Sequence, residues 1–372
     1  VLSKSNISQI DKKFDYESKE IKEKKRIDLS KNNSYMFKSW NGDSSPLMPL
    51  IQIEQEKNKS FKLWLHTNAI SERLDLSNKK SIEKFFNKFE SFPLLNNWQN
   101  YLSKNICDAS EFKLGKENQA VSLCLYLNSD YEIVNWSFHL TIVKCSSIIE
   151  NKQLEALLTR KSKTRITSLV LKPIKKYVED LDKILEISKE FRKKQLLNGK
   201  VEIAKPINNI KSLEELFVYN PVEYTKEYFE PLNKSDCHTY LSPILFEADL
   251  IWFKQSNGLK IKSASYISKE VDYIDMSEII KYSELVDSDI ELNENGNLAF
   301  NQLAELCNDL NKKRILNKLL ISLLKDNQLE LITKNSEINE SENTYLSPWT
   351  LPGYDFANLI NQYNIYNMIT NG

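Results

Sequence analysis

The stretch QAVSLCLYL, residues 119–127, decides the fold class. Apolar and polar side chains alternate along it, which is the two-residue period of a β-strand. After the turn residues Asn128-Ser129-Asp130, the stretch WSFHLTI, residues 136–142, repeats the alternation. Asn, Ser and Asp favour turns, so the two stretches predict an antiparallel hairpin with one buried face.

Segments on either side of the hairpin extend this picture. The apolar stretch LWLH, residues 63–66, favours a further strand of the same sheet. Downstream, apolar residues recur every three or four positions along 181–191, 245–253 and 315–324, which is the helical period. Strands therefore come before helices, and this order predicts an α+β fold, with a mixed, mainly antiparallel sheet packed against several helices.

Length and charge set the domain organisation and the environment. We expect residues 1–25, where acids and bases alternate, to form a flexible or helical arm, and residues 26–372 to form one domain. The chain has no apolar run of membrane-spanning length and no apolar signal core. Its five cysteines are widely spaced, so we expect reduced thiols and a cytoplasmic protein without a membrane partner.

The charge balance and the missing motifs exclude several function classes. Lys plus Arg equals Asp plus Glu at 51 each, so no overall positive field attracts nucleic acid. Only seven glycines occur, and no glycine-rich phosphate loop is among them, which excludes kinases, NTPases and dinucleotide-dependent dehydrogenases. The three histidines have no metal-spaced partners, and we expect structural roles for those on strands, His66 and His139.

Seven segments follow one another in an order typical of one family. They are RIDL (26–29), LWLHTNA (63–69), the hairpin (119–143), a helix (178–197) followed by GKVEI (199–203), a second helix with NGLK (244–262), RILNKLL (314–320), and YLSP (345–348) with NLINQ (358–362). Together they resemble the catalytic domain of the ribonuclease II (RNB) family over residues 26–370. The resemblance implies an RNB-like fold. The cold-shock and S1 barrels that flank this domain in the family are not expected within these residues.

The resemblance also implies a chemistry, because RNB enzymes remove nucleotides from the 3′ end of RNA with Mg²⁺ held by an aspartate cluster. Mg²⁺ needs oxygen ligands, but the four aspartate positions fall here on Trp40, Pro46, Met48 and Pro49. Asp43, the only acid between Trp40 and Glu54, is expected to be a turn residue. We therefore expect no bound metal cofactor.

A second family feature is also missing. The family's motif S-P-I-R-R-Y supplies an arginine that clamps a phosphate, whereas the sequence here reads SPWTLP over residues 347–352. The retained scaffold predicts a catalytically silent RNB-like protein in RNA metabolism that binds single-stranded RNA or an RNA-processing protein, and not DNA. The residues that the resemblance places at the RNA are His66, Tyr345, Ser347 and Gln362.

Two alternatives stay open at this point. One is a residual Mg²⁺-dependent 3′–5′ exoribonuclease, which requires acids from distant segments, such as Asp75, Asp108 and Glu111, to converge on one site. The other is an unrelated α+β interaction protein.

Overall fold

The structure is a computed structural model of the 372-residue chain. It describes residues 25–38, 47–56, 60–76, 79–88, 90–94, 97–160, 169–197, 237–267, 328–332 and 345–371, with four isolated positions between 277 and 284. Residues 1–24 of the predicted N-terminal arm, the segment 199–203 and the predicted helix 315–324 lie outside these residues.

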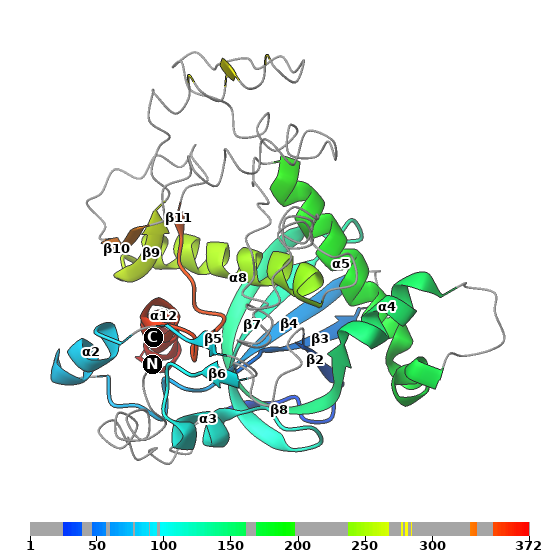
Figure 1. The fold of residues 1–372 in the computed structure, drawn as a ribbon, viewed down its shortest axis with the longest axis horizontal. Helices are drawn as coiled ribbons and strands as arrows, with labels where there is room; N and C mark the ends of the chain where they lie inside the picture. The colour runs from blue at the N-terminus through cyan, green and yellow to red at the C-terminus, as the bar shows by residue number, and fades with distance from the viewer. Residues whose placement is uncertain are drawn as a thin grey trace, which may run out of the picture.

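A six-stranded sheet forms the centre of the fold (Figure 1). Its strand order is β1-β8-β2-β3-β4-β7, with an additional pairing between β7 and β8. The two N-terminal strands run parallel to β8, and the other neighbours are antiparallel. The strands are β1 (Ile27–Asp28), β2 (Ser34–Lys38), β3 (Leu50–Gln55), β4 (Phe61–Asn68), β7 (Glu117–Leu127) and β8 (Ile133–Glu150).

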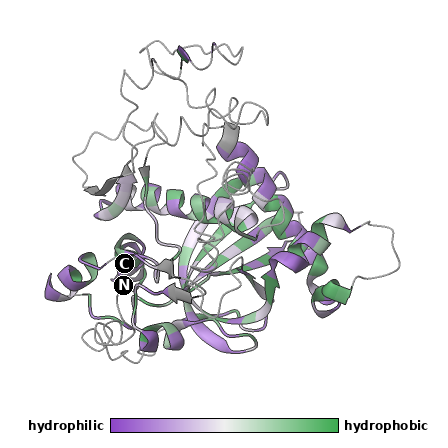
Figure 2. Ribbon diagram, viewed as in Figure 1, coloured by the Kyte–Doolittle hydropathy of each residue, from purple (hydrophilic) through white to green (hydrophobic). Residues whose placement is uncertain are grey.

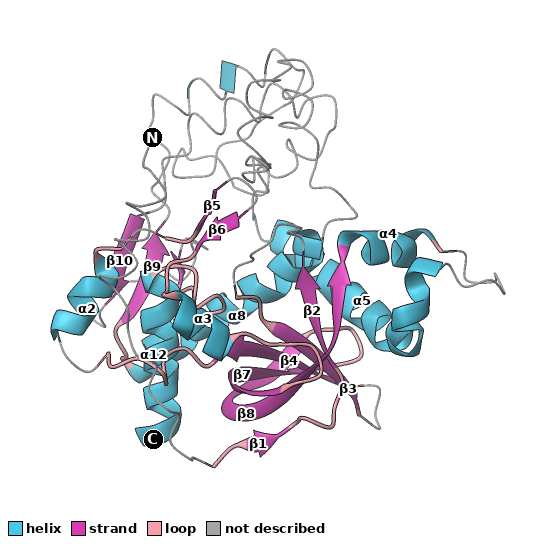
Figure 3. Ribbon diagram, turned by 60° about the horizontal axis from the view of Figure 1, so that its bottom comes forward, coloured by secondary structure: helices cyan, strands magenta, loops and turns pink. Residues whose placement is uncertain are grey.

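The additional pairing closes the sheet into a ring. Strand β8 is 18 residues long, and it pairs with β7 along its first part and with β2 along its last six residues. The strands β8, β2, β3, β4 and β7 therefore form a closed circuit, and Figure 3 shows the resulting curl. Alternate side chains of each strand point to the inside and the outside of such a ring.

Closure changes the burial that the hairpin was expected to have. The hairpin itself is confirmed, since β7 and β8 pair antiparallel from Glu117 to Leu127, but the expected single buried face is wrong for β7. Residues 120–125 are all buried, because helices cover one face of the strand and the ring interior encloses the other. The strand predicted at residues 63–66 is confirmed as part of β4, which pairs with β7.

Helices pack on the outer face of the ring. The long helices are α5 (Val178–Leu197), α8 (Cys237–Leu259) and α12 (Phe356–Asn371), and the shorter ones are α2 (Lys79–Phe86), α3 (Lys104–Ser110), α4 (Asn151–Thr159) and the 3₁₀ helix η1 (Leu169–Tyr177). Small sheets complete the described fold, one from β5 (Phe92–Leu94) and β6 (Asn97–Gln99), the other from β9 (Ser263–Ile267), β10 (Gln328–Ile332) and β11 (Tyr345–Leu346). The α+β prediction is confirmed.

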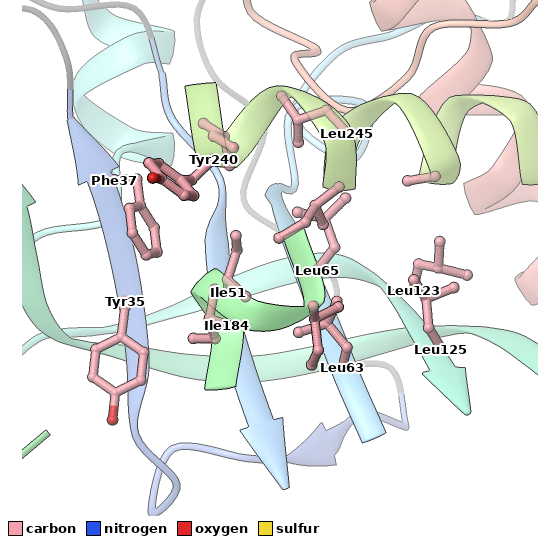
Figure 4. Close-up of a cluster of buried hydrophobic side chains, with 14 of the residues drawn as sticks. Tyr35, Phe37, Ile51, Leu63, Leu65, Leu123, Leu125, Ile184, Tyr240 and Leu245 are labelled. Carbon is pink, nitrogen blue, oxygen red and sulfur yellow. The ribbon is translucent and has the colours of Figure 1, made fainter. Parts of the chain in front are cut away.

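The main core lies between the ring and the helices α5 and α8. Figure 4 shows Ile184 of α5 and Leu245 of α8 in one cluster with strand residues such as Leu65, all of them buried. The predicted stripe on α5 is confirmed, because its members face this core: Leu181, Ile184, Leu185, Ser188 and Phe191. In Figure 2 green, hydrophobic residues concentrate on the strands, whereas the outside of α5 carries purple, hydrophilic ones. Burial of each large aliphatic side chain contributes about 1.5–3 kcal/mol to folding.

Hydrogen bonds and ion pairs join distant segments to this core. Arg26 forms a buried ion pair with Glu72, and its guanidinium lies 3.4 Å from the carbonyl oxygen of Thr141. The hydroxyl of Tyr35 in β2 donates to the carboxylate of Asp180 in α5. Among the described helices, none combines the length and the apolar character that crossing a bilayer requires.

Candidate functional site

Residues 47–49, which we call the LMP segment, lead directly into β3. Leu47 and Pro49 are buried, and Leu47 belongs to an apolar cluster with Ile70 and Leu359. Met48 is half-buried and packs against both the main core and the apolar part of the ring interior. Hydrocarbon side chains therefore fill the place where the resemblance puts the last two aspartates of the metal-binding motif. Trp40, Asp43 and Pro46 lie outside the described residues.

Residues 347–350, which we call the SPWT segment, follow β11 and lie where the resemblance puts the family's phosphate-clamping motif. Trp349 is fully buried, its indole Nε1 donates to the carbonyl oxygen of Ala248 at 3.0 Å, and its ring packs edge-on against Phe138. Thr350 is also buried. Aromatic and hydroxyl groups that pack in this way stabilise the fold but offer no cation to a phosphate.

Contacts at Gly353 bring the two segments together. A Cβ atom on this glycine would lie 3.0 Å from Cδ1 of Leu47 and 3.4 Å from Cδ1 of Ile70. The carbonyl oxygen of Gly353 also accepts a hydrogen bond from Ser91 Oγ at 3.0 Å. The chain after the SPWT segment is thus packed closely onto the LMP segment, as expected if both belong to one site.

A buried carboxyl group holds the SPWT segment. Asp249 lies in the middle of α8, where Oδ1 accepts from the backbone amide of Trp349 at 3.0 Å and Oδ2 from the hydroxyl of Thr350 at 3.4 Å. Burial away from water raises the pKa of Asp249 to about 8. Sequence reasoning missed this residue, although an acid inside the apolar run 245–253 was a signal, since a buried acid needs hydrogen-bond partners.

His66 lies inside the ring, in β4, and is fully buried. Its Nδ1 shares a hydrogen bond of 2.8 Å with Ser122 Oγ, which shares one of 2.7 Å with Thr141 Oγ1. The imidazole stacks on Trp64, and its Nε2 has no hydrogen-bond partner within the described part of the chain. Burial lowers the pKa of His66 to about 3, so the ring is neutral at pH 7.

Gln362 and Ser347, two other residues predicted to contact RNA, are fully buried as well. Gln362, in α12, accepts from the amide of Ser71 at 3.0 Å and donates to Thr67 Oγ1 at 2.8 Å. Ser347 shares hydrogen bonds with the hydroxyls of Ser263 and Ser265. These bonds fix α12 and the SPWT segment to the rest of the fold.

Tyr345, the fourth predicted residue, lies in β11 opposite Ile267 of β9, and its side chain is outside the described residues. A role of these four residues in RNA binding stays a prediction. For His66, Ser347 and Gln362 the burial favours positioning of neighbouring segments over direct contact.

The acids that a residual nuclease would need lie on the surface. Asp75 follows the turn after β4, whereas Asp108 and Glu111 are exposed at the end of α3, where Glu111 Oε2 lies 3.7 Å from Lys113 Nζ. Within the described ranges, no group of three or more His, Cys, Asp or Glu side chains is arranged to hold a metal ion. Two Mg²⁺ ions require clustered oxygen ligands, so the described residues at the motif positions do not fit the family's metal pair.

Comparisons with solved structures agree with this fold. RNase R of Mycoplasma genitalium, in complex with ribose-methylated single-stranded RNA, matches with a TM-score of 0.72 and 12% identity, over 98% of this chain and 54% of that chain. Yeast Ssd1, described as a pseudonuclease, matches with a TM-score of 0.66 and 13% identity, over 93% of this chain and 40% of that chain. An active-site mutant of the Dss1 exoribonuclease of Candida glabrata matches with a TM-score of 0.65 and 13% identity, over 100% of this chain and 46% of that chain.

This chain thus spans about half the length of these proteins. No curated protein matches the sequence significantly. The family model of the RNB domain, however, matches residues 26–371, which removes the alternative of an unrelated α+β protein. With the ring, the helices over it and the order of the motifs in agreement, the chain belongs to the RNB family.

Proposed function

We propose that this chain is a catalytically silent member of the RNB family that binds RNA without cleaving it. The observation that carries the proposal is the LMP segment: two of the four positions for metal-holding aspartates carry Met48 and Pro49, which pack against the core. Carboxylates placed there would be buried beside hydrocarbon at a large desolvation cost. The packing of Gly353 on Leu47 occupies the adjacent space.

The SPWT segment supports the same proposal. Trp349 and Thr350 replace the part of the motif that supplies the phosphate clamp, and both are fixed by Asp249. Neither the metal-held phosphate nor the clamped phosphate of an exonuclease has a partner among these described side chains. That the same fold exists in yeast Ssd1, a pseudonuclease, is consistent with a role without cleavage.

RNA is the proposed ligand because of the solved relatives. Mycoplasma genitalium RNase R has been seen with both single-stranded and double-stranded RNA. A partner protein in RNA processing stays a second prediction, and we make no proposal about its identity.

The test is incubation of the full chain with 5′-labelled single-stranded RNA and Mg²⁺ or Mn²⁺, with an active RNase R as the positive control. We expect the labelled RNA to keep its length and to be retarded in a native gel. Stepwise shortening of the RNA from the 3′ end that EDTA stops would refute the proposal that the protein is catalytically silent. A D43N variant is the matched control, because Asp43 is the only acid between Trp40 and Glu54. Shortening that D43N abolishes would reveal an unrecognised metal ligand.

A further inference from the structure

The helix η1 (Leu169–Tyr177) divides cleanly into one buried and two exposed rows. A 3₁₀ helix has three residues per turn, so side chains at positions i and i+3 lie above one another. The buried row is Leu171, Ile174 and Tyr177, which pack into the main core. The other six residues are exposed. In the sequence LVLKPIKKY the buried residues recur every third position, so one row of side chains packs into the core and the other two rows face the solvent.

Three of the six exposed residues are lysines. Lys172 and Lys175 lie in one row and Lys176 in the other, and we call these three residues the η1 lysine surface. Within the described part of the chain, none of them forms an ion pair with a carboxylate. Among the nearest acids, Asp180 and Asp182 are instead bound to Tyr35 and Arg160. Glu179, two residues after η1, is exposed. The Nζ of Lys176 lies 4.6 Å from the centroid of the Tyr177 ring, which orders that ammonium group at the surface.

The sequence around η1 is basic although the whole chain is neutral. From 156 to 178 there is no acidic residue, but seven basic ones occur, at positions 160, 161, 163, 165, 172, 175 and 176. Residues 161–168 lie outside the described structure and enter only through their composition. In a chain with 51 bases and 51 acids, such a stretch is a local excess of positive charge along the sequence.

We propose that the η1 lysine surface binds the phosphate backbone of RNA on the outside of the RNB fold. This rests on the proposed function and adds a location to it. Three flexible ammonium groups spread over two rows suit a repeating chain of phosphates better than one compact anion. The contact is independent of base sequence, because phosphates carry no sequence information.

The apolar start of η1 raises a competing ligand. Leu169 is 76% exposed and Val170 41%, and exposed aliphatic groups beside lysines also suit an anionic membrane surface. Of the six exposed residues, three are lysines and three are apolar: Leu169, Val170 and Pro173. RNA is favoured because the lysines extend over both exposed rows, whereas the two aliphatic residues stand together at one end. Vesicle binding is therefore a separate arm of the test.

The experiment measures fluorescence anisotropy of 5′-fluorescein oligouridylate with the full chain over a series of salt concentrations. The test variant is K172Q/K175Q/K176Q, and the charge-preserving variant is K172R/K175R/K176R. The matched control is K79Q/K80Q/K84Q, which removes three exposed lysines from α2. Helix α2 lies on the opposite side of the molecule from α4, against which η1 packs (Figures 1 and 3). Circular dichroism checks that each variant is folded.

We expect the test variant to bind about 10- to 100-fold more weakly at about 0.1 M salt, because each neutralised phosphate of a single strand contributes about 0.7 to the salt slope. The slope should fall by about 2 for three lost contacts. The arginine variant should bind as the wild type does, and the α2 control should change little.

The other outcomes are distinct. RNA binding by the wild type that the test variant retains would overturn the η1 location but leave the proposed function standing. No RNA binding by the wild type would overturn both. Binding to phosphatidylserine vesicles, lost in the test variant, with no effect of that variant on RNA affinity, would assign the surface to lipid instead.

Discussion

The carboxyl group of Asp249 in α8 accepts a hydrogen bond of 3.0 Å from the backbone amide of Trp349, 100 residues further along the chain. This bond attaches the SPWT segment to the longest described helix, and the Trp349 indole adds a second bond to the preceding residue of that helix, Ala248. A buried amide without its acceptor is costly, so Asp249 fixes the conformation of the segment.

Removal of this acceptor should be costly, whereas an isosteric replacement should not. At about pH 4 or below, where Asp249 is largely protonated in both states, we expect D249A to lower the free energy of unfolding by about 1–3 kcal/mol, because the amide of Trp349 is left buried and unpaired. D249N keeps an acceptor oxygen and should cost no more than about 1 kcal/mol. Urea unfolding of the two variants measures this, and equal losses would contradict the assigned hydrogen bond.

The same residue predicts a pH dependence. The pKa of Asp249 is raised to about 8 in the folded protein from an ordinary value of 3.8. Between these values the unfolded chain loses its proton while the folded protein keeps it, so the stability that Asp249 contributes falls as the pH rises from about 4 to about 8. Wild type should therefore lose stability relative to D249N over this range. A difference that is constant with pH would exclude a protonated Asp249.

The pKa shift of His66 should make the folding stability fall as the pH falls, opposite to the effect of Asp249. Burial lowers its pKa to about 3 from 6.5, so the unfolded chain takes up a proton below about pH 6.5 and the folded protein does not. The wild type should lose stability relative to H66N as the pH falls from about 6.5 towards 3, by at most about 1.4 kcal/mol per pH unit. Comparison with H66N removes the contribution of the other histidines. An NMR titration that places the His66 pKa near 6.5 would refute this prediction.

Gly353 tests the packing of the LMP segment. G353A should destabilise the protein by about 1–3 kcal/mol, because the added methyl would lie 3.0 Å from Leu47 Cδ1. In the double variant L47A/G353A the added methyl group has space. The loss of unfolding free energy in the double variant should therefore be smaller than the sum of the losses in the two single variants. Gly258, in α8, has no atom within 4 Å of a Cβ, and G258A should be neutral or slightly stabilising. If the losses of unfolding free energy in L47A and G353A were additive, the side chain of Leu47 would not contact residue 353.

Local patterns predicted the elements of this fold well. Alternation at residues 119–127 indicated β7, and the helical stripe from Leu181 to Phe191 indicated the buried side of α5, since both depend only on side chains near in sequence. Closure of the ring was not predictable in this way. It depends on parallel pairing of β2 with β8, in which Ser34 lies opposite Cys145, and no local period encodes a partner more than 100 residues away.

The candidate site was predictable only in part. The motifs located the LMP and SPWT segments and showed which side chains were missing, because those are properties of single positions. For His66 the strand pattern predicts a structural role. The burial of Ser347 and Gln362 was not foreseen, since a polar residue in a motif looks the same whether it faces a ligand or a hydrogen-bond partner inside the fold. Asp249 gained its role only from contacts with a segment distant in sequence.

The circuit of strands through β8 also limits how this protein can associate with others. An open sheet presents unpaired amide and carbonyl groups at its margins, where an extended peptide can add as a new strand. Because β7 and β2 both pair with β8, neither end of the series β2-β3-β4-β7 is left without a neighbouring strand in the described residues. An extended peptide therefore cannot add as a new strand at β2 or β7 where each is paired with β8.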